Sequence, residues 1–180
     1  MAPPFILSIV LITLCCLIFV KGEPLEAPRF LSIDVAEKVG ILISYSSIEE
    51  WEKDKSLLIQ WQQNQRAKIQ FVVYIDDNLK MINNNECIKI VAKNHFSIFG
   101  HLNHQYTQDL MQEKFDILID INTNTNLPIL YLQFLSDSIL RIGRDSEKIK
   151  FYNLVIQTDS SICIVEHLTE VEKYLKQLSA

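Results

Sequence analysis

Glycine is scarce in this chain: its 180 residues include four, Gly22, Gly40, Gly100 and Gly143. A dinucleotide-binding fingerprint or a P-loop needs several clustered glycines, because backbone amides must approach the phosphates closely. Glycines spread this widely cannot form either motif. The sequence therefore excludes a glycine-rich nucleotide loop, and it contains no nucleophile elbow.

Cysteine and histidine are also sparse, and their spacing does not favour a metal. Two of the four cysteines lie in the apolar N-terminus, which leaves Cys87 and Cys163. These two could pair in an exported domain and would be buried thiols in a cytosolic one. His101 and His104 are three residues apart without a surrounding zinc pattern. We predict no metal centre, and we expect the four histidines to lie on the surface.

Basic residues are outnumbered by acidic ones. Because Lys21 is the one charged side chain in residues 1–22, residues 23–180 carry 16 Lys and Arg against 22 Asp and Glu, a net charge of −6. No basic field is present to gather phosphates, which disfavours nucleic acid and anionic lipid. We predict no nucleic-acid partner and no cofactor, and we leave a protein partner open.

Residues 1–22 form a hydrophobic N-terminal segment, with no charge between Pro4 and Val20. One interpretation is a secretory signal peptide cleaved after Gly22. Another is an uncleaved anchor that attaches the protein to a membrane, since about 20 apolar residues span a bilayer. Both interpretations predict an exported or membrane-anchored protein. A third is a misassigned start, which would leave the protein in the cytoplasm.

The rest of the chain alternates apolar strands with helices. A polar, proline-containing linker occupies residues 23–29, and residues 30–180 are predicted to form a single α/β domain. The strand Phe115–Ile121 is apolar almost throughout, as in parallel sheets covered on both faces. We predict a three-layer sandwich with a mainly parallel sheet, a Rossmann-like half. The expected strands are Val39–Tyr45, Lys68–Ile75, Ile88–Ala92, Phe115–Ile121, Ile139–Ile142 and Asn153–Gln157.

Each expected helix has a sequence signal. Ser47 and Glu50 fit a capping box at the start of the first helix. The third helix is apolar on nearly every face, which predicts deep burial. In the last helix, apolar residues spaced 4, 3, 4 and 3 apart predict one stripe laid on the sheet. The expected helices are Ser47–Gln65, Gln105–Glu113, Leu127–Ser136 and Ile164–Leu178.

Candidate ligand-binding residues follow two of the strands. Asp76 and Asp77 end the second strand, where carboxylates could hold Mg²⁺ or Mn²⁺ against a diphosphate, although Asp-Asp-Asn is also ordinary turn chemistry. Asp120 ends the fourth strand, and Asn122 and Asn124 follow in a polar loop. That loop could bind a sugar or another small polar ligand, or it could be a turn with a helix cap.

Two arginines flank the end of the fifth strand. Arg141 and Arg144 bracket Ile142–Gly143 and could meet a phosphate. We favour exposed positions at the edge of the sheet.

Several segments resemble an uncharacterised bacterial family, a domain of unknown function. The matching motifs are an aromatic turn, an apolar strand, a strand that ends in glycine and an amphipathic C-terminal helix: Phe96–Phe99–Gly100, Phe115–Ile119, Ile142–Gly143 and Val171–Leu178. The resemblance covers residues 30–180 and implies no activity.

The stretch Phe115–Gly143 is also similar to the N-terminal half of ADP-heptose-type lipopolysaccharide glycosyltransferases. Those enzymes pair two Rossmann-like halves and bind the nucleotide sugar mainly through the second half. Where they carry a Gly/Asp-rich catalytic turn, this chain has Ser44–Ser47. The likeness implies the fold and argues against the activity.

Two hypotheses result. In the first, the chain is a non-catalytic α/β domain without catalytic residues, which acts as a binding or interaction module. In the second, it is a degenerate or partner-dependent glycosyltransferase-like protein. That protein would bind a nucleotide sugar with Asp76, Asp77 and Asp120.

Overall fold

The computed structural model describes residues 30–80, 84–97, 101–111, 113–124, 127–144, 151–159 and 161–179. The hydrophobic segment 1–22 and the linker 23–29 lie outside the described residues, as do Phe99 and Gly100 of the predicted aromatic turn. Within the described ranges, no helix has the length and apolar character needed to cross a membrane.

Six strands form one sheet in the order β3-β2-β1-β4-β5-β6, and every neighbouring pair is parallel. The predicted parallel sheet is therefore confirmed, with the first, second and fourth strands side by side at its centre. The strands are β1 (Lys38–Tyr45), β2 (Lys68–Ile75), β3 (Ile88–Ala92), β4 (Lys114–Asp120), β5 (Asp137–Gly143) and β6 (Leu154–Val155).

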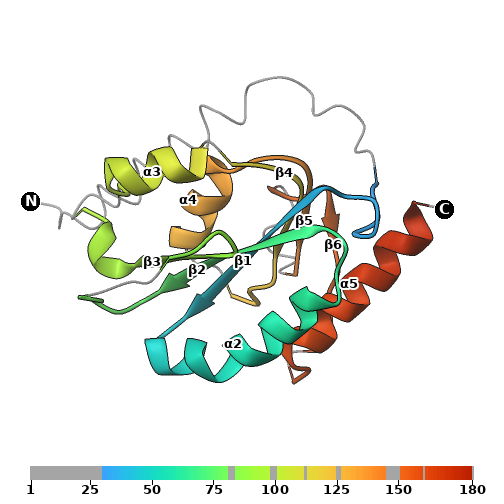
Figure 1. Ribbon diagram of the computed structural model, residues 1–180, viewed down its shortest axis with the longest axis horizontal. Helices are drawn as coiled ribbons and strands as arrows, with labels where there is room; N and C mark the ends of the chain where they lie inside the picture. Colours follow the sequence, from blue (N-terminus) through green and yellow to red (C-terminus); the bar gives the residue numbers. More distant parts are fainter. Residues whose placement is uncertain are drawn as a thin grey trace, which may run out of the picture.

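Four α-helices cover the two faces of the sheet in the described residues (Figure 1). Figure 1 shows α2 (Ile48–Gln63) and α5 (Ile164–Leu178) below the sheet, with α3 (His104–Met111) and α4 (Leu127–Leu135) above it. A short 3₁₀ helix, Lys93–His95, follows β3. This arrangement has the three layers that the sequence predicts.

The central strands are apolar because both of their faces are buried. In β1, Ile41 and Ile43 belong to the cluster shared with α2 and α5, while Leu42 belongs to the cluster shared with α3 and α4. All three are at most 2% exposed. A strand buried on both faces needs apolar residues at successive positions, which explains the unbroken run in the sequence.

Helix α4 is less buried than its composition predicts. Ile129, Leu132 and Gln133 are buried, but Leu127 is 38% exposed and other apolar residues are half-buried. The prediction of deep burial was wrong, because α4 is an outer-layer helix and turns only one stripe toward the sheet.

The strand order creates a topological switch point between β1 and β4. The helix that follows β1 lies on one face of the sheet, and the helix that follows β4 lies on the other. In doubly wound sheets, the loops at such a point diverge and leave a crevice at the carboxyl ends of the strands, where ligands bind. The carboxyl edge of the sheet at the switch point is therefore where a ligand site is expected.

Candidate functional site at the carboxyl edge of the sheet

Asp120 ends β4 at the switch point and is fully buried. The hydroxyl of Tyr152 donates to Asp120 Oδ2 at 2.5 Å. Asn122 donates to Asp120 Oδ1 twice, from its side-chain Nδ2 at 2.6 Å and from its backbone amide at 3.0 Å. Both carboxylate oxygens are therefore hydrogen-bonded, as a buried carboxylate requires.

Gly143 makes room for Tyr152. It pairs with Asp120 across β4 and β5, and a Cβ at this position would lie 2.2 Å from Tyr152 Cε2. The phenol ring thus packs directly on the glycine backbone beside the carboxylate. Sequence reasoning missed Tyr152. The only signal in the sequence was that one strand, β5, ends in Gly143 while the neighbouring strand, β4, ends in Asp120.

Asn122 connects β4 to β1. Its Oδ1 accepts from the Ser44 amide at 2.8 Å and from the Ser44 hydroxyl at 2.6 Å, and its Nδ2 also lies 3.3 Å from the carbonyl oxygen of Leu42. The side chain is buried between the two strand ends. The side-chain amide of Asn122 therefore links the ends of β1 and β4 at the switch point.

The N-terminus of α2, which is the phosphate position in many doubly wound folds, is occupied by the protein's own side chains. Ser47 caps the helix by accepting from the amide of Glu50 at 3.4 Å. The carboxylate of Glu50 accepts from the amide of Ser46 at 2.9 Å. The predicted capping box is thus half right, because Glu50 reaches one residue further back than Ser47.

Asp76 and Asp77 lie at the same edge, after β2, but apart from Asp120, since β1 stands between β2 and β4. Asp76 Oδ1 accepts from the Tyr74 hydroxyl at 3.1 Å and lies 3.1 Å from Lys93 Nζ. Asp77 Oδ1 accepts from the amide of Asn78 at 2.7 Å. Both aspartates are exposed and take part in turn contacts.

Asn124 is exposed in the loop after β4, two residues beyond the buried Asn122. The structure therefore brings Asp120 and Asn122 together and leaves Asn124 at the rim. Among the described residues, no group of three or more His, Cys, Asp or Glu side chains is arranged to hold a metal ion.

Arg144 corrects the expectation of exposed arginines at the strand edge. It is 6% exposed, its backbone amide donates to the carbonyl of Asp120 at 3.1 Å, and its Nη2 donates to the carbonyl of Asp159 at 2.7 Å. Arg141 is half-buried and donates from Nε to Ser138 Oγ at 3.0 Å. The expectation fails because β6 and the segment before α5 cover this end of β5.

His167, on α5, is buried, so the expectation of surface histidines is wrong at this position. Its Nδ1 lies 3.0 Å from Thr158 Oγ1. Burial and the nearby positive charge of Arg144 lower the pKa of His167 to about 4, so the ring is neutral at pH 7.

His95 is also buried, beside the 3₁₀ helix, whereas His101 and His104 are exposed as expected. The ring of His95 stacks on Tyr106 with a centroid separation of 4.1 Å, and its Nδ1 accepts from the amide of Ala92 at 3.2 Å. Burial lowers the pKa of His95. These contacts are those of a satisfied core histidine.

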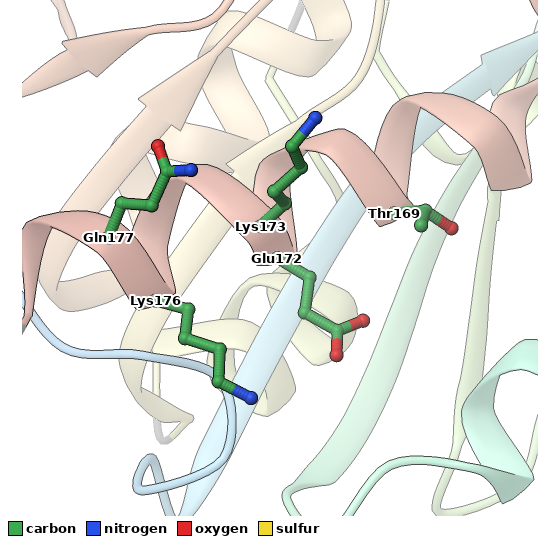
Figure 2. A pocket seen from close by; sticks show the side chains of 5 residues that line it. All are labelled: Thr169, Glu172, Lys173, Lys176 and Gln177. Atoms are coloured by element: carbon green, nitrogen blue, oxygen red, sulfur yellow. The ribbon is translucent and has the colours of Figure 1, made fainter.

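A hollow of about 500 Å³ lies along α5, away from the switch point (Figure 2). Figure 2 shows Glu172 and Lys176 on one side of the helix and Lys173 and Gln177 on the other. Glu172 Oε2 accepts from Gln65 at 3.4 Å, and Lys176 lies 3.7 Å from Asp34. These contacts connect α5 to neighbouring segments, and they do not bring catalytic side chains together in the hollow.

The fold and these contacts define a doubly wound α/β domain whose carboxyl edge is closed by its own side chains. The chain belongs to a family of unknown function, DUF6913, whose family model matches residues 23–178. A comparison with curated proteins found no match. The predicted membership of a domain family of unknown function is confirmed, while the likeness to glycosyltransferases stays a prediction.

Proposed function

We propose that this protein is a non-catalytic α/β domain that acts as a binding or interaction module. The observation that carries the proposal is the state of Asp120, the one fully buried carboxylate among the described residues. Tyr152 and Asn122 occupy both of its oxygens. A carboxylate bonded in this way stabilises the fold and is not free to hold a metal or to activate a substrate.

The N-terminus of α2 supports the same proposal. In nucleotide-binding sheets, the amides at this point receive a diphosphate. Here the Glu50 carboxylate already accepts a hydrogen bond from the amide of Ser46. Glu49 adds a second negative charge in the first turn of α2. A phosphate would have to displace one carboxylate and approach the other, so the position disfavours nucleotides.

In this proposal, the exposed rim of this edge is the recognition surface. It carries the acidic side chains of Asp76 and Asp77 and the polar side chains of Thr123 and Asn124. Such a surface suits a protein partner or a small polar ligand, and its charge disfavours nucleic acid.

A second candidate function is that of a degenerate or partner-dependent glycosyltransferase-like protein. The strand order and switch point favour it, because this is the architecture that binds nucleotides in doubly wound folds. Asp76 and Asp77 are exposed at the end of β2 and are the carboxylates that could take part in metal-assisted binding.

A thermal-shift screen with UDP-, GDP- and ADP-sugars, with and without Mn²⁺, separates the two functions. The binding-module proposal expects no stabilisation that depends on Mn²⁺. A Mn²⁺-dependent shift that disappears when Asp76→Ala and Asp77→Ala are combined would sink it. Asp109→Ala, at an exposed position on α3, is the matched control and should behave like the unaltered protein.

We also propose that residues 1–22 direct the protein out of the cytoplasm, as a cleaved signal peptide or as a retained anchor. The uncharged run from Pro4 to Val20 supports this proposal. Mass spectrometry of the mature protein after cell fractionation tests it. We expect either cleavage after Gly22 or an intact chain in the membrane fraction, and an intact chain in the cytosol would contradict both.

A further inference from the structure

We propose that Asn84, Asn85 and His95 close the outer edge of β3 and thereby prevent a second copy of this chain from pairing with it. Strand β3 is the last strand on one side of the sheet, next to β2. An open edge strand is a template for pairing with another chain, so proteins cover or interrupt such edges. A closed edge is compatible with both candidate functions, so the inference goes beyond either of them.

The backbone amides of β3 point alternately toward β2 and away from the sheet. The amide of Phe71 in β2 donates to the carbonyl of Cys87 at 2.7 Å, so the carbonyl of Cys87 faces β2. Lys89 and Val91 follow at steps of two and face the same way. The outward amides are therefore those of the residues in between, Ile88, Ile90 and Ala92.

Two asparagines accept from the first two outward amides. The amide of Ile88 donates to Asn85 Oδ1 at 2.7 Å. The amide of Ile90 donates to Asn84 Oδ1, also at 2.7 Å. The backbone amide of Asn85 in turn donates to the carbonyl of Ile88 at 3.0 Å. Asn84 and Asn85 thus lie along the outer edge of β3, in the place that a neighbouring strand would take.

His95 accepts from the third outward amide. The amide of Ala92 donates to His95 Nδ1 at 3.2 Å. The ring is buried and stacks on Tyr106 with a centroid separation of 4.1 Å, which fixes its orientation. An incoming strand needs all three amides as donors, and it would have to displace two asparagines and a packed imidazole to obtain them.

The composition of β3 explains why the edge needs closing. Four of the five residues in Ile88–Ala92 are apolar, and short segments of this kind pair readily with identical copies. A free lysine on an edge strand would deter such pairing, but Lys89 Nζ lies 2.6 Å from Glu113. A second copy of the chain is therefore the partner that the closure excludes.

Amide hydrogen exchange of the full chain, followed residue by residue by NMR, tests the closure. We expect slow exchange at Ile88 and Ile90 in the unaltered protein. Asn84→Ala removes the acceptor of the Ile90 amide and should accelerate its exchange by about tenfold. Asn84→Asp keeps an acceptor oxygen and should preserve slow exchange. The amide of Lys89, which faces β2, should be unaffected by both changes.

Sedimentation velocity tests the consequence for self-association. The combined variant Asn84→Ala and Asn85→Ala should associate more strongly than the unaltered protein as its concentration rises. Its Ile88 and Ile90 amides should exchange fast at low concentration and slowly at high concentration, because the second copy then covers them. Asn94→Ala is the matched control, since it removes two hydrogen bonds to Leu79 in an exposed turn and should not change association.

Three results would overturn the proposal. The first is fast exchange at Ile88 and Ile90 in the unaltered protein. The second is a folded double variant that associates no more than the Asn94→Ala control, or that associates while both amides stay in fast exchange. The third, which decides if the double variant does not fold, is equal exchange at Ile90 in Asn84→Ala and Asn84→Asp.

The outcome is separable from that of the proposed function. Closure of the β3 edge should be independent of Mn²⁺ and of nucleotide sugars, whereas the glycosyltransferase-like alternative requires both.

Discussion

At the scale of single residues, Asp120 is the most constrained side chain of the carboxyl edge. Its carboxylate is buried in a region of low dielectric, where a charge is tolerated only with full hydrogen bonding. The donors come from Asn122, which also bonds to β1, and from Tyr152 beyond β5. One carboxylate thereby ties together segments that lie far apart in the sequence.

Removal of the Tyr152 hydroxyl should destabilise the fold. Tyr152→Phe keeps the ring but leaves Asp120 Oδ2 without this donor, and an unsatisfied buried acceptor costs about 1–3 kcal/mol. Urea denaturation should show the loss as a lower midpoint with an unchanged slope. Tyr74→Phe is the matched control, because its hydroxyl meets the exposed carboxylate of Asp76. Equal losses in the two variants would contradict this account.

Gly143→Ala should also destabilise the fold, for a steric reason. The added methyl group would overlap the Tyr152 ring, and overpacking of this kind typically costs about 1–3 kcal/mol. In a Tyr152→Ala background the obstacle is gone, so the same change should cost much less. A double-mutant cycle measures this coupling, and simple additivity of the two changes would refute the predicted contact.

At the scale of elements, α2 begins where its capping side chains meet the end of β1. Ser47→Ala removes the cap and should cost about 1 kcal/mol. Ser46→Ala is the control, since Ser46 contributes its backbone amide and has an exposed side chain. Its effect should stay within about 0.5 kcal/mol. Thermal or urea unfolding compares the two, and a loss as large in Ser46→Ala would argue against the cap.

The helices differ in how far the sequence predicted them. Helix α5 has the central part of the expected stripe, with Leu168, Val171 and Leu175 fully buried, because its polar residues leave only one face for the sheet. At the two ends of the stripe, Ile164 is half-buried and Leu178 is 48% exposed. Helix α4 has almost no polar residues, so its sequence carries no information about which face turns inward. Its half-exposed outer side depends on its place in the outer layer.

At the scale of the whole molecule, stability should depend on pH in two separate windows. Folding lowers the pKa of His167 from 6.5 to about 4, so the unfolded chain binds the extra proton first as the pH falls. The free energy of unfolding should therefore decrease between pH 6.5 and 4, by roughly 3 kcal/mol from this group. His95, whose pKa burial also lowers, adds to the same loss.

The second window belongs to Glu113, at the amino edge of the sheet. Partial burial would raise its pKa, but hydrogen bonds and charges from Lys38 and Lys89 outweigh that effect and lower the pKa from 4.5 to about 2. Its contribution is present above pH 4.5 and is lost as the pH falls toward 2. Solvent screening limits it to about 1 kcal/mol.

Urea denaturation at a series of pH values checks both windows. His167→Gln should reduce the slope between pH 6.5 and 4. Glu113→Gln should lower stability by a constant amount above pH 4.5 and reduce the slope below pH 4.5. A slope between pH 6.5 and 4 that is unaffected by His167→Gln would show that the histidine is not buried and neutral.

The sequence by itself determined the layered α/β class, the central parallel strands and the amphipathic last helix. These features depend on local patterns, since a strand buried on both faces must be apolar along its length and a helix on a sheet must repeat every three to four residues. It also identified Asp120 and Asn122 as residues at a strand end.

Only the tertiary structure decided what those residues contact. The meeting of Asp120 with Tyr152 depends on the pairing of β4 with β5 and on the space above Gly143, and neither leaves a periodic signal. The burial of Arg144 and His167 likewise depends on how α5 lies against the end of β5. Contacts between distant segments are set by the packing of whole elements, so the spacing of residues along the chain does not encode them.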